Sequence, residues 1–181
     1  MRKGKSRRDG FSLVEMVIII GIIGVLVGGT GLAIGLLRSA DTKGAAYDIN
    51  SALTSLKSKT TGGKNQPYLY VYLYGNEYYL DTSYDKPDSY EPTTEAKKIG
   101  DDRLQIMFGS DADRKALDNA SGGGADKTLC IAFQKKDGAF LVDGKCICPN
   151  KIFIRDNGSS EDDYVICLVK DTGHHYIEGQ E

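Results

Sequence analysis

The hydrophobic and polar positions divide the chain into three parts, of which the first is the most distinctive. Residues 11–37 form an apolar run in which Glu15 is the only charged side chain. A helix rises about 1.5 Å per residue, and about 20 apolar residues cross the roughly 30 Å hydrocarbon core of a bilayer. The pattern therefore predicts a helix long enough to span a membrane.

The second part, residues 38–61, continues the helical pattern but is amphipathic. Its apolar residues recur at spacings of three and four, which places them on one face of a helix. No proline occurs before Pro67, so one long helix is predicted, with its stop at residues 60–63. We expect the apolar face to pack on a sheet. The face consists of Ala45, Ala46, Ile49, Leu53 and Leu56.

The third part, residues 62–181, begins with an alternating pattern that is typical of strands. In residues 68–74 tyrosine alternates with leucine or valine, and Gly75-Asn76 is a good two-residue hairpin turn before a second strand. The tyrosine face has two interpretations. It is either a binding surface for glycans, partners or neighbouring subunits, or the half-buried face of a sheet under a loop.

The rest of this part predicts further strands, with Asp137-Gly138 as a second hairpin signal. The fold class is therefore α+β: a long N-terminal helix, transmembrane in its first half and amphipathic in its second, packed on a mostly antiparallel β-sheet. The remaining expected elements are a loop over 85–102, strands over 103–108, 128–134, 139–148 and 164–169, and a short capped helix over 110–120.

The charges are distributed unevenly along the chain. There are 23 lysines and arginines and 25 aspartates and glutamates, for a net charge of −2. Residues 1–10 hold five of the basic side chains and Asp9, so without them the chain carries 18 basic and 24 acidic groups, a net of −6. An acidic remainder does not favour a nucleic-acid partner. The basic cluster before the apolar run favours a cytoplasmic N-terminus, with the bulk of the protein outside the cytoplasm.

Residues 9–16, with the sequence DGFSLVEM, join the basic cluster to the apolar run and resemble the leader and cleavage site of type IV prepilins. The resemblance implies that a dedicated aspartic peptidase in the membrane cuts between Gly10 and Phe11 and methylates the new amino group of Phe11. Glu15 becomes the fifth residue of the mature subunit. An ordinary secretory signal fits less well, because its apolar core runs about 7 to 15 residues and ends at small residues, unlike residues 37–41.

Glu15 needs a physical reason, because an unpaired charge inside a membrane costs about 3 kcal/mol or more. After cleavage Phe11 carries a cationic amine, and two buried opposite charges relieve each other's desolvation when they meet. The amine meets Glu15 either of its own helix or of a staggered neighbour. We expect the second, as a recruitment contact during assembly. A plain membrane anchor does not explain the carboxylate.

Glycines interrupt the apolar run at spacings that matter for helix packing. The pairs Gly24 with Gly28 and Gly31 with Gly35 permit close approach of neighbouring helices. Each glycine also costs about 1 kcal/mol of helix propensity relative to alanine. We therefore expect the helix to loosen around residues 28–31 when it is packed in a filament.

Cys130, Cys146, Cys148 and Cys167 all lie in the last third of the chain. An even number in an exported segment favours disulfides, and four cysteines allow three pairings. Cys146 and Cys148 are not expected to join, because residues two apart on a strand point the same way. The second hairpin brings Cys130 near Cys146, which leaves Cys148 with Cys167. Disulfide-closed C-terminal loops in pilins agree with this by resemblance.

Metal and catalytic chemistry find little support in the sequence. His174 and His175 with the cysteines have the right ligand types for zinc, but their spacing matches no zinc motif and exported thiols tend to oxidise. Asp156, Asp162 and Asp163 are weak calcium candidates, because the full twelve-position loop is missing. No nucleophile elbow, phosphate loop or metalloprotease motif occurs. We expect no enzymatic activity and no cofactor.

The function that these features and the resemblance imply is that of a structural subunit of a type IV pilus-like filament at the cell surface, anchored as a single pass in the cytoplasmic membrane before assembly. Its expected partners are other copies and related pilins, the prepilin peptidase, and a pilus assembly platform with its ATPase. One alternative is a pseudopilin or minor pilin of a type II secretion or DNA-uptake system. Another is a membrane-tethered surface binding module that does not polymerise. The expected parts are a removed leader (1–10), the membrane and filament-core helix (11–37), its amphipathic continuation (38–61) and a β-rich head (62–181).

Overall fold

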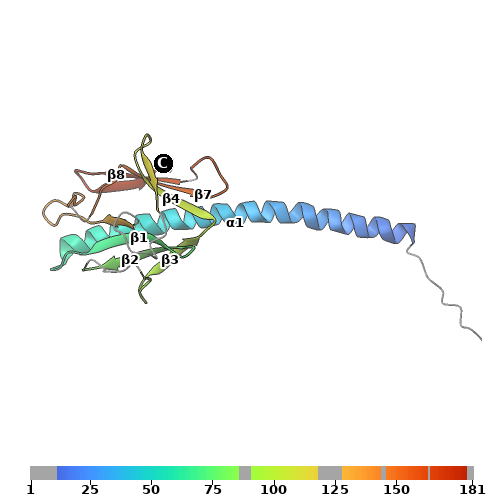
Figure 1. Cartoon of the computed structure of the whole chain (residues 1–181), viewed down its shortest axis with the longest axis horizontal. Coiled ribbons are helices and arrows are strands. Elements are labelled where there is room, and N and C mark those ends of the chain that lie inside the picture. Colours follow the sequence, from blue (N-terminus) through green and yellow to red (C-terminus); the bar gives the residue numbers. More distant parts are fainter. Residues whose placement is uncertain (1–11, 86–90, 118–127, 144–145, 163, 179–181) are drawn as a thin grey trace, which may run out of the picture. The chain divides into compact units, whose positions relative to one another are not determined.

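The structure is a computed structural model that describes residues 12–85, 91–117, 128–143, 146–162 and 164–178; within this set, the side chains of residues 27–39 are not described (Figure 1). The chain divides into two units, one up to Leu37 and the other from Arg38 onward.

Helix α1, Leu13–Gly62, is the only helix within the described ranges and contributes to both units. It ends at the predicted stop. Near its end the hydroxyl of Thr60 donates to the carbonyl of Leu56, one turn back, at 2.9 Å, a bond that threonine side chains commonly make in helices. The helix stop predicted at residues 60–63 is therefore confirmed.

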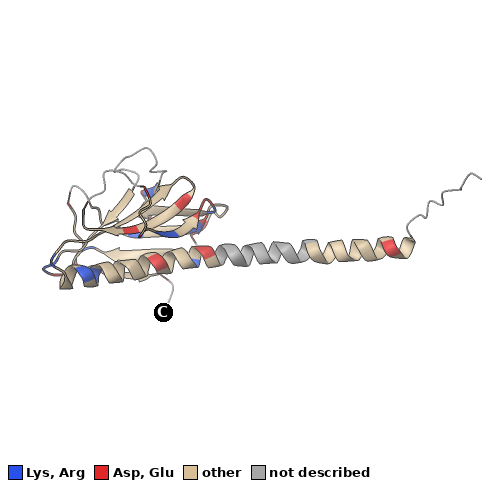
Figure 2. Cartoon of the chain, turned by 90° about the horizontal axis from the view of Figure 1, so that it is seen from below, with Lys and Arg blue, Asp and Glu red and all other residues tan. Residues whose placement is uncertain are grey.

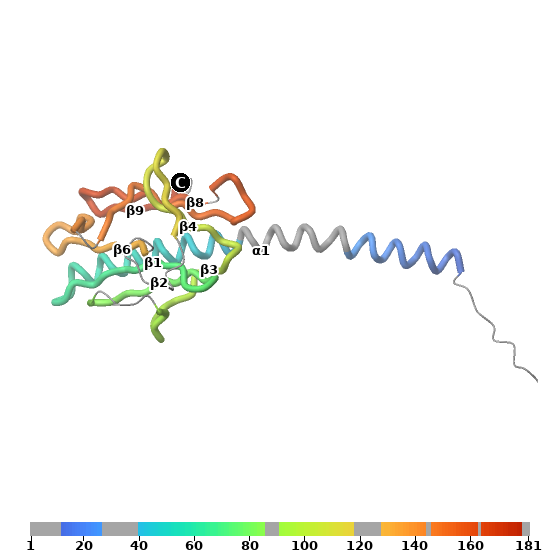
Figure 3. The backbone as a smooth tube through the Cα atoms, in the orientation of Figure 1, coloured from blue at the N-terminus to red at the C-terminus, as the bar shows by residue number. Residues whose placement is uncertain are grey.

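The first sheet has four strands in the order β3-β2-β1-β6, and every neighbouring pair is antiparallel. The predicted hairpin of β1 and β2 is confirmed, with Tyr74 opposite Glu77 and Gly75 in the left-handed region at a φ of 62°. Figure 3 shows β1 lying beside the C-terminal part of α1. The strands are β1 Tyr68–Tyr74, β2 Glu77–Ser83, β3 Lys97–Asp101 and β6 Thr128–Ile131.

The second sheet has five strands in the order β5-β4-β7-β8-β9, again with every neighbouring pair antiparallel. The strands predicted over 103–108 and 164–169 correspond to β4 and β8. The α+β class with antiparallel pairing is thus confirmed, although two sheets replace the single one that was expected. The strands are β4 Leu104–Gly109, β5 Arg114–Ala116, β7 Lys151–Asp156, β8 Tyr164–Val169 and β9 His174–Ile177.

One hydrophobic core joins the C-terminal part of α1 to both sheets. The five residues of the predicted apolar face of α1 are each at most 1% exposed. They meet Leu69 and Val71 of β1 on one side and Ile166 and Leu168 of β8 on the other, because alternate residues of a strand share a face. The amphipathic pattern therefore identified the helix face that both sheets cover.

Three of the predicted elements differ in the structure. The capped helix predicted over 110–120 is wrong for its described residues, 110–117: Ser110 and Asp113 exchange backbone hydrogen bonds of 3.0 and 3.2 Å in a tight turn that leads into β5. Residues 118–120 lie outside the described residues. The loop predicted over 85–102 contains β3. Of the strand predicted over 139–148, the described residues 139–143 and 146–148 show one bridge, between Phe133 and Phe140, and the Asp143 carboxylate accepts the Cys146 amide at 2.8 Å.

Candidate functional site

The start of α1 is the first part of the candidate site. The carbonyl of Ser12 accepts the amide of Met16 at 3.1 Å, so Ser12 holds the cap position and Glu15 lies in the first turn. Ser12 and Glu15 have the spacing of a capping box, in which the side chains satisfy free amides of the first turn. A carboxylate is also favourable near the positive end of the helix dipole. Glu15 is thus suited to its position in the helix, a role that the sequence reasoning overlooked although its signal was present.

The large apolar side chains of α1 between Leu13 and Leu26 are all exposed, from 39% at Ile19 to 79% at Leu13. On the same stretch, a Cβ added at Gly21 or Gly24 would meet no atom within 4 Å. This part of α1 therefore presents apolar surface and open backbone positions. No helix within the described part of the chain is long and apolar enough to cross a membrane.

Several predicted site residues lie where the structure gives no side-chain information. Gly10 and Phe11, the proposed cleavage residues, are outside the described residues. Gly28, Gly31 and Gly35 lie in the stretch of α1 whose side chains are not described. Cleavage, methylation and glycine packing therefore stay predictions.

Cys130 and Cys146 form a disulfide, as the hairpin pairing predicted. The predicted pairing of Cys148 with Cys167 is wrong, because both are free thiols. Cys148 packs against the core between the sheets. Cys167 alternates with the core residues Ile166 and Leu168 on β8 and so points to the opposite face of the second sheet. An even number of cysteines in the sequence does not indicate on which face of the sheet each thiol lies, so it could not show that these two are separated.

Replacing Cys130 by serine is expected to lower the free energy of unfolding by about 3 kcal/mol. The disulfide closes a loop with a sequence separation of 16 residues, and a cross-link over a loop of that size restricts the unfolded chain by this amount. Urea unfolding of the detergent-solubilised full chain measures the change. Cys167→Ser serves as the control, since it removes no cross-link, and an equal loss in both variants would contradict the assignment.

The Cys148 thiol is expected to react slowly in the folded chain. Its half-buried position raises the pKa to about 11, chiefly through desolvation, so the neutral thiol dominates until well above pH 8. Since the thiolate is the nucleophile, alkylation by iodoacetamide at pH 8 should be at least about tenfold slower than in urea. Labelling of Cys148, followed over time by peptide mass spectrometry, measures the two rates. Equal rates would show that the thiol is exposed.

The tyrosine face of the first sheet forms a second, smaller cluster. Tyr70 and Tyr72 are each 2% exposed and pack with the disulfide, Ala132 and Leu141. Burial raises the pKa of Tyr72 to about 12, with Asp81 adding to the shift. These contacts favour the interpretation of this face as a half-buried part of the sheet over that of an open binding surface.

The acidic turn that follows β7 is organised by its own hydrogen bonds. The Asp156 carboxylate accepts the Gly158 amide at 3.3 Å, and the Asp162 carboxylate binds the Arg114 guanidinium at 2.6 Å. That guanidinium lies 3.9 Å above the centre of the Phe153 ring, so Asp162 positions a cation on the outer face of the second sheet. Asp163, the third calcium candidate, is outside the described residues.

The two histidines have separate neighbours. His175 Nε2 lies 3.1 Å from the Thr54 hydroxyl of α1, and the His174 ring is tilted against the Tyr176 ring with 5.5 Å between the ring centres. Burial, then Lys57 and His174, lower the pKa of His175. Within the described residues, no three histidine, cysteine or acidic side chains gather as a metal site.

Comparison with known proteins identifies the N-terminal segment. Residues 5–31 match the family model described as the prokaryotic N-terminal methylation motif. The segment therefore carries the leader and cleavage motif of type IV prepilin-like proteins, as the resemblance of residues 9–16 predicted. The match is confined to this N-terminal segment. No curated protein and no solved structure matches it.

Proposed function

We propose that the chain is a structural subunit of a type IV pilus-like filament. The observation that carries the proposal is the methylation motif over residues 5–31, which includes the junction of Gly10 and Phe11. The motif implies processing by a prepilin peptidase. Support comes from the exposed apolar side chains of Leu13–Leu26, since such a surface needs either lipid or other helices to cover it.

The parts of the chain have separate roles in this proposal. Residues 1–10 are the leader and remain in the cytoplasm until cleavage. Residues 11–37 span the membrane before assembly and form the filament core afterwards. Residues 38–61 support the head, 62–181, at the cell surface. The apolar face of α1 under both sheets is the kind of packing that such a head needs.

Assembly in this proposal depends on contacts between helices. The methylated amine of Phe11 in one subunit meets Glu15 of a staggered neighbour, and Gly24, Gly28, Gly31 and Gly35 allow the helices to approach closely. An assembly platform and its ATPase add the subunits. These contacts between helices would hold together either a pilus or a shorter pseudopilin filament.

One experiment tests the proposal in cells that produce the full chain. Mass spectrometry of the mature N-terminus is expected to find Phe11 with one added methyl group, and electron microscopy of sheared surface material is expected to show filaments containing the chain. A mature chain that retains Arg2 to Arg8 would contradict processing. A processed chain that stays in the membrane without filaments would instead favour a tethered binding module.

A further inference from the structure

The edge strand β9 is joined to α1 by a small group of polar contacts. His175 lies on the same face of β9 as the core residue Ile177, and its Nε2 is 3.1 Å from the hydroxyl of Thr54. Three residues further along α1, Lys57 donates to the carbonyls of Thr172 and Gly173 in the turn before β9, at 3.0 and 3.1 Å. We call the group of Thr54, Lys57, Gly173 and His175 the α1–β9 contact.

Two nitrogen atoms of the α1–β9 contact share one acceptor. The Gly173 carbonyl oxygen lies 3.1 Å from Lys57 Nζ and 3.3 Å from His175 Nδ1. The centre of the Phe133 ring is 5.8 Å from Lys57 Nζ and 6.1 Å from the centre of the His175 ring. Both side chains are half-buried. A lysine ammonium is therefore held close to the imidazole, in surroundings that are only partly open to water.

The hydrogen bonds of the contact fit a neutral His175. With its proton on Nδ1, the ring donates to the Gly173 carbonyl, and Nε2 accepts the Thr54 hydroxyl. A second proton, on Nε2, turns the Thr54 hydroxyl to the carbonyl of Asn50, which is 3.0 Å away. It also places two cations on one carbonyl oxygen, that of Gly173. Protonation thus keeps the hydrogen bonds but adds repulsion between two positive charges.

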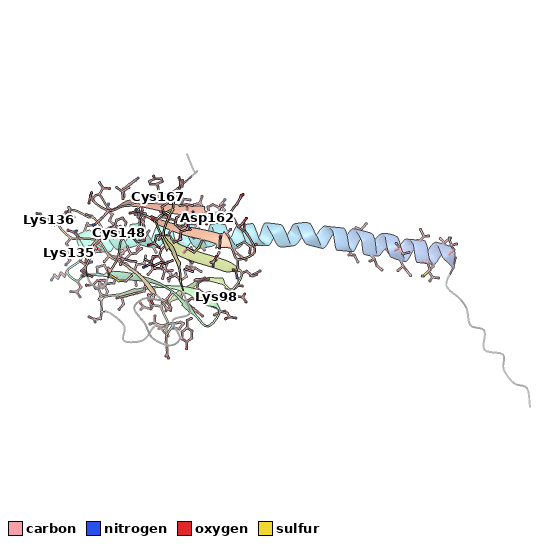
Figure 4. The ribbon with its side chains drawn as sticks, turned by 45° about the horizontal axis from the view of Figure 1, so that its top comes forward. Lys98, Lys135, Lys136, Cys148, Asp162 and Cys167 are labelled. Atoms are coloured by element: carbon pink, nitrogen blue, oxygen red, sulfur yellow. A yellow bond between two sulfur atoms is a disulfide. The ribbon has the colours of Figure 1, made fainter. Side chains whose placement is uncertain are left out.

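No carboxylate among the described residues forms an ion pair with His175. Figure 2 shows a basic position, in blue, near the end of α1, and the acidic positions, in red, nearer its start. Figure 4 shows Lys135 and Lys136 at the end of the unit where α1 stops. Cations outnumber carboxylates on the elements around the ring: Lys57 on α1, His174 on β9, Lys135, Lys136 and Asp137 in one turn, and Lys170 and Asp171 in the other.

These surroundings lower the pKa of His175. Burial is the largest cause, and the charges of Lys57 and His174 lower the pKa further, while the carbonyls of Gly173 and Asn50 act in the opposite direction. A solvated histidine, as in the detached strand, has its usual pKa of about 6.5. The contact is therefore fully stabilising above that pH, and its contribution is lost as the pH falls below it.

Strand β9 has few other interactions that hold it in place. It pairs with β8 alone, over the four residues His174–Ile177. Ile177 is its residue in the core cluster, whereas Tyr176 is 46% exposed on the other face of the sheet. Loss of the contact with α1 therefore leaves one strand pairing and one apolar side chain to keep β9 in position.

We propose that mild acid releases β9 from α1 through protonation of His175. Release separates the imidazolium from Lys57 and exposes both to water, and it uncovers Ile177 and the part of the core that Ile177 covers. The pairing of β4, β7 and β8 does not involve β9, so the rest of the second sheet keeps its strands. The release takes place within one head and does not depend on how the chain assembles.

Hydrogen exchange of the detergent-solubilised full chain tests this release. Between about pH 7.5 and about pH 5.5, the protection of the β9 amides, corrected for the intrinsic exchange rate, is expected to fall about threefold or more. The amides of β1 in the same sample are the internal control and should keep their protection. Nuclear magnetic resonance titration of the ring protons should give a lower pKa for His175 in the folded chain than in urea.

Two variants separate His175 from the neighbouring histidine. His175→Gln keeps a side chain that can hydrogen-bond to Thr54 but takes up no proton, so the loss of protection at low pH should disappear. His174→Gln is the matched control, because His174 is exposed, and it should retain most of that loss. An equal loss in His175→Gln, or β9 amides of the unmodified chain that stay protected at low pH, would overturn the inference. Neither result bears on filament formation, so the proposed function is tested separately.

Discussion

Glu15→Val is expected to abolish most filament formation while leaving the chain processed and inserted in the membrane. The cleavage site lies between Gly10 and Phe11, outside the substituted position, and valine makes the apolar run more apolar. The amine of Phe11 would then be buried among helices without its carboxylate. Breaking a buried ion pair on one side costs about 3 to 5 kcal/mol, so the yield of sheared filament should fall at least about a hundredfold.

Two variants separate the charge of Glu15 from its place in the first turn of α1. Glu15→Asp keeps the carboxylate and should retain part of the yield. Glu15→Gln keeps the shape and a hydrogen-bonding group for the capping box but removes the charge, and it should behave like the valine variant. Immunoblots of membrane and sheared fractions, with N-terminal mass spectrometry, provide the measurements. Normal filaments from Glu15→Gln would rule out the pairing with the amine.

Leu53→Ala is expected to lower the free energy of unfolding by about 2 to 5 kcal/mol. Leu53 is fully buried in the core between α1 and the two sheets, and the shortened side chain leaves a cavity that touches both. Because the chain has 11 tyrosines and no tryptophan, near-ultraviolet circular dichroism of the tyrosines reports the loss of packing. Urea titration of the detergent-solubilised full chain gives the midpoint.

Ser55→Ala is the matched control for this experiment. Ser55 lies two positions further along α1 and is exposed, so the same new residue there should change stability by less than about 0.5 kcal/mol. An unchanged midpoint for Leu53→Ala would show that the core does not depend on α1. A large loss in both variants would show that the effect does not come from the burial of Leu53.

The sequence predicted the elements that have a strong periodic pattern. The apolar face of α1 repeats with helical spacing over several turns, and the hairpin of β1 and β2 combines strict alternation with a glycine turn. β3 and β5 escaped prediction, and both are edge strands, which pack on one neighbour only. Their residues, KKIGD and RKA, contain too few apolar positions to reveal a period. The central strand β7 and the edge strand β9 were missed as well. The aspartates of residues 110–120 led to the wrong prediction of a helix, because a helix cap and a tight turn use the same side chains.

The candidate site was predictable where it depends on local sequence. The leader junction is a short contiguous motif, and the motif match over residues 5–31 bears it out. The partner of Cys130 followed from a nearby turn. That Cys148 and Cys167 are free thiols did not follow from the sequence, because it depends on where the fold places each thiol relative to the second sheet. Likewise, the contact of Arg114 with Asp162 joins residues 48 positions apart through the fold alone.

The core also has a consequence for how the protein is made. Ile177 of β9 belongs to the same cluster as Ala45 of α1, so the apolar face of α1 receives part of its cover from a segment that is synthesised much later. Contacts between such distant positions form slowly, and the uncovered face is prone to aggregation in the meantime. Folding of this chain should therefore benefit from a chaperone that shields the apolar face of α1 until β9 is available.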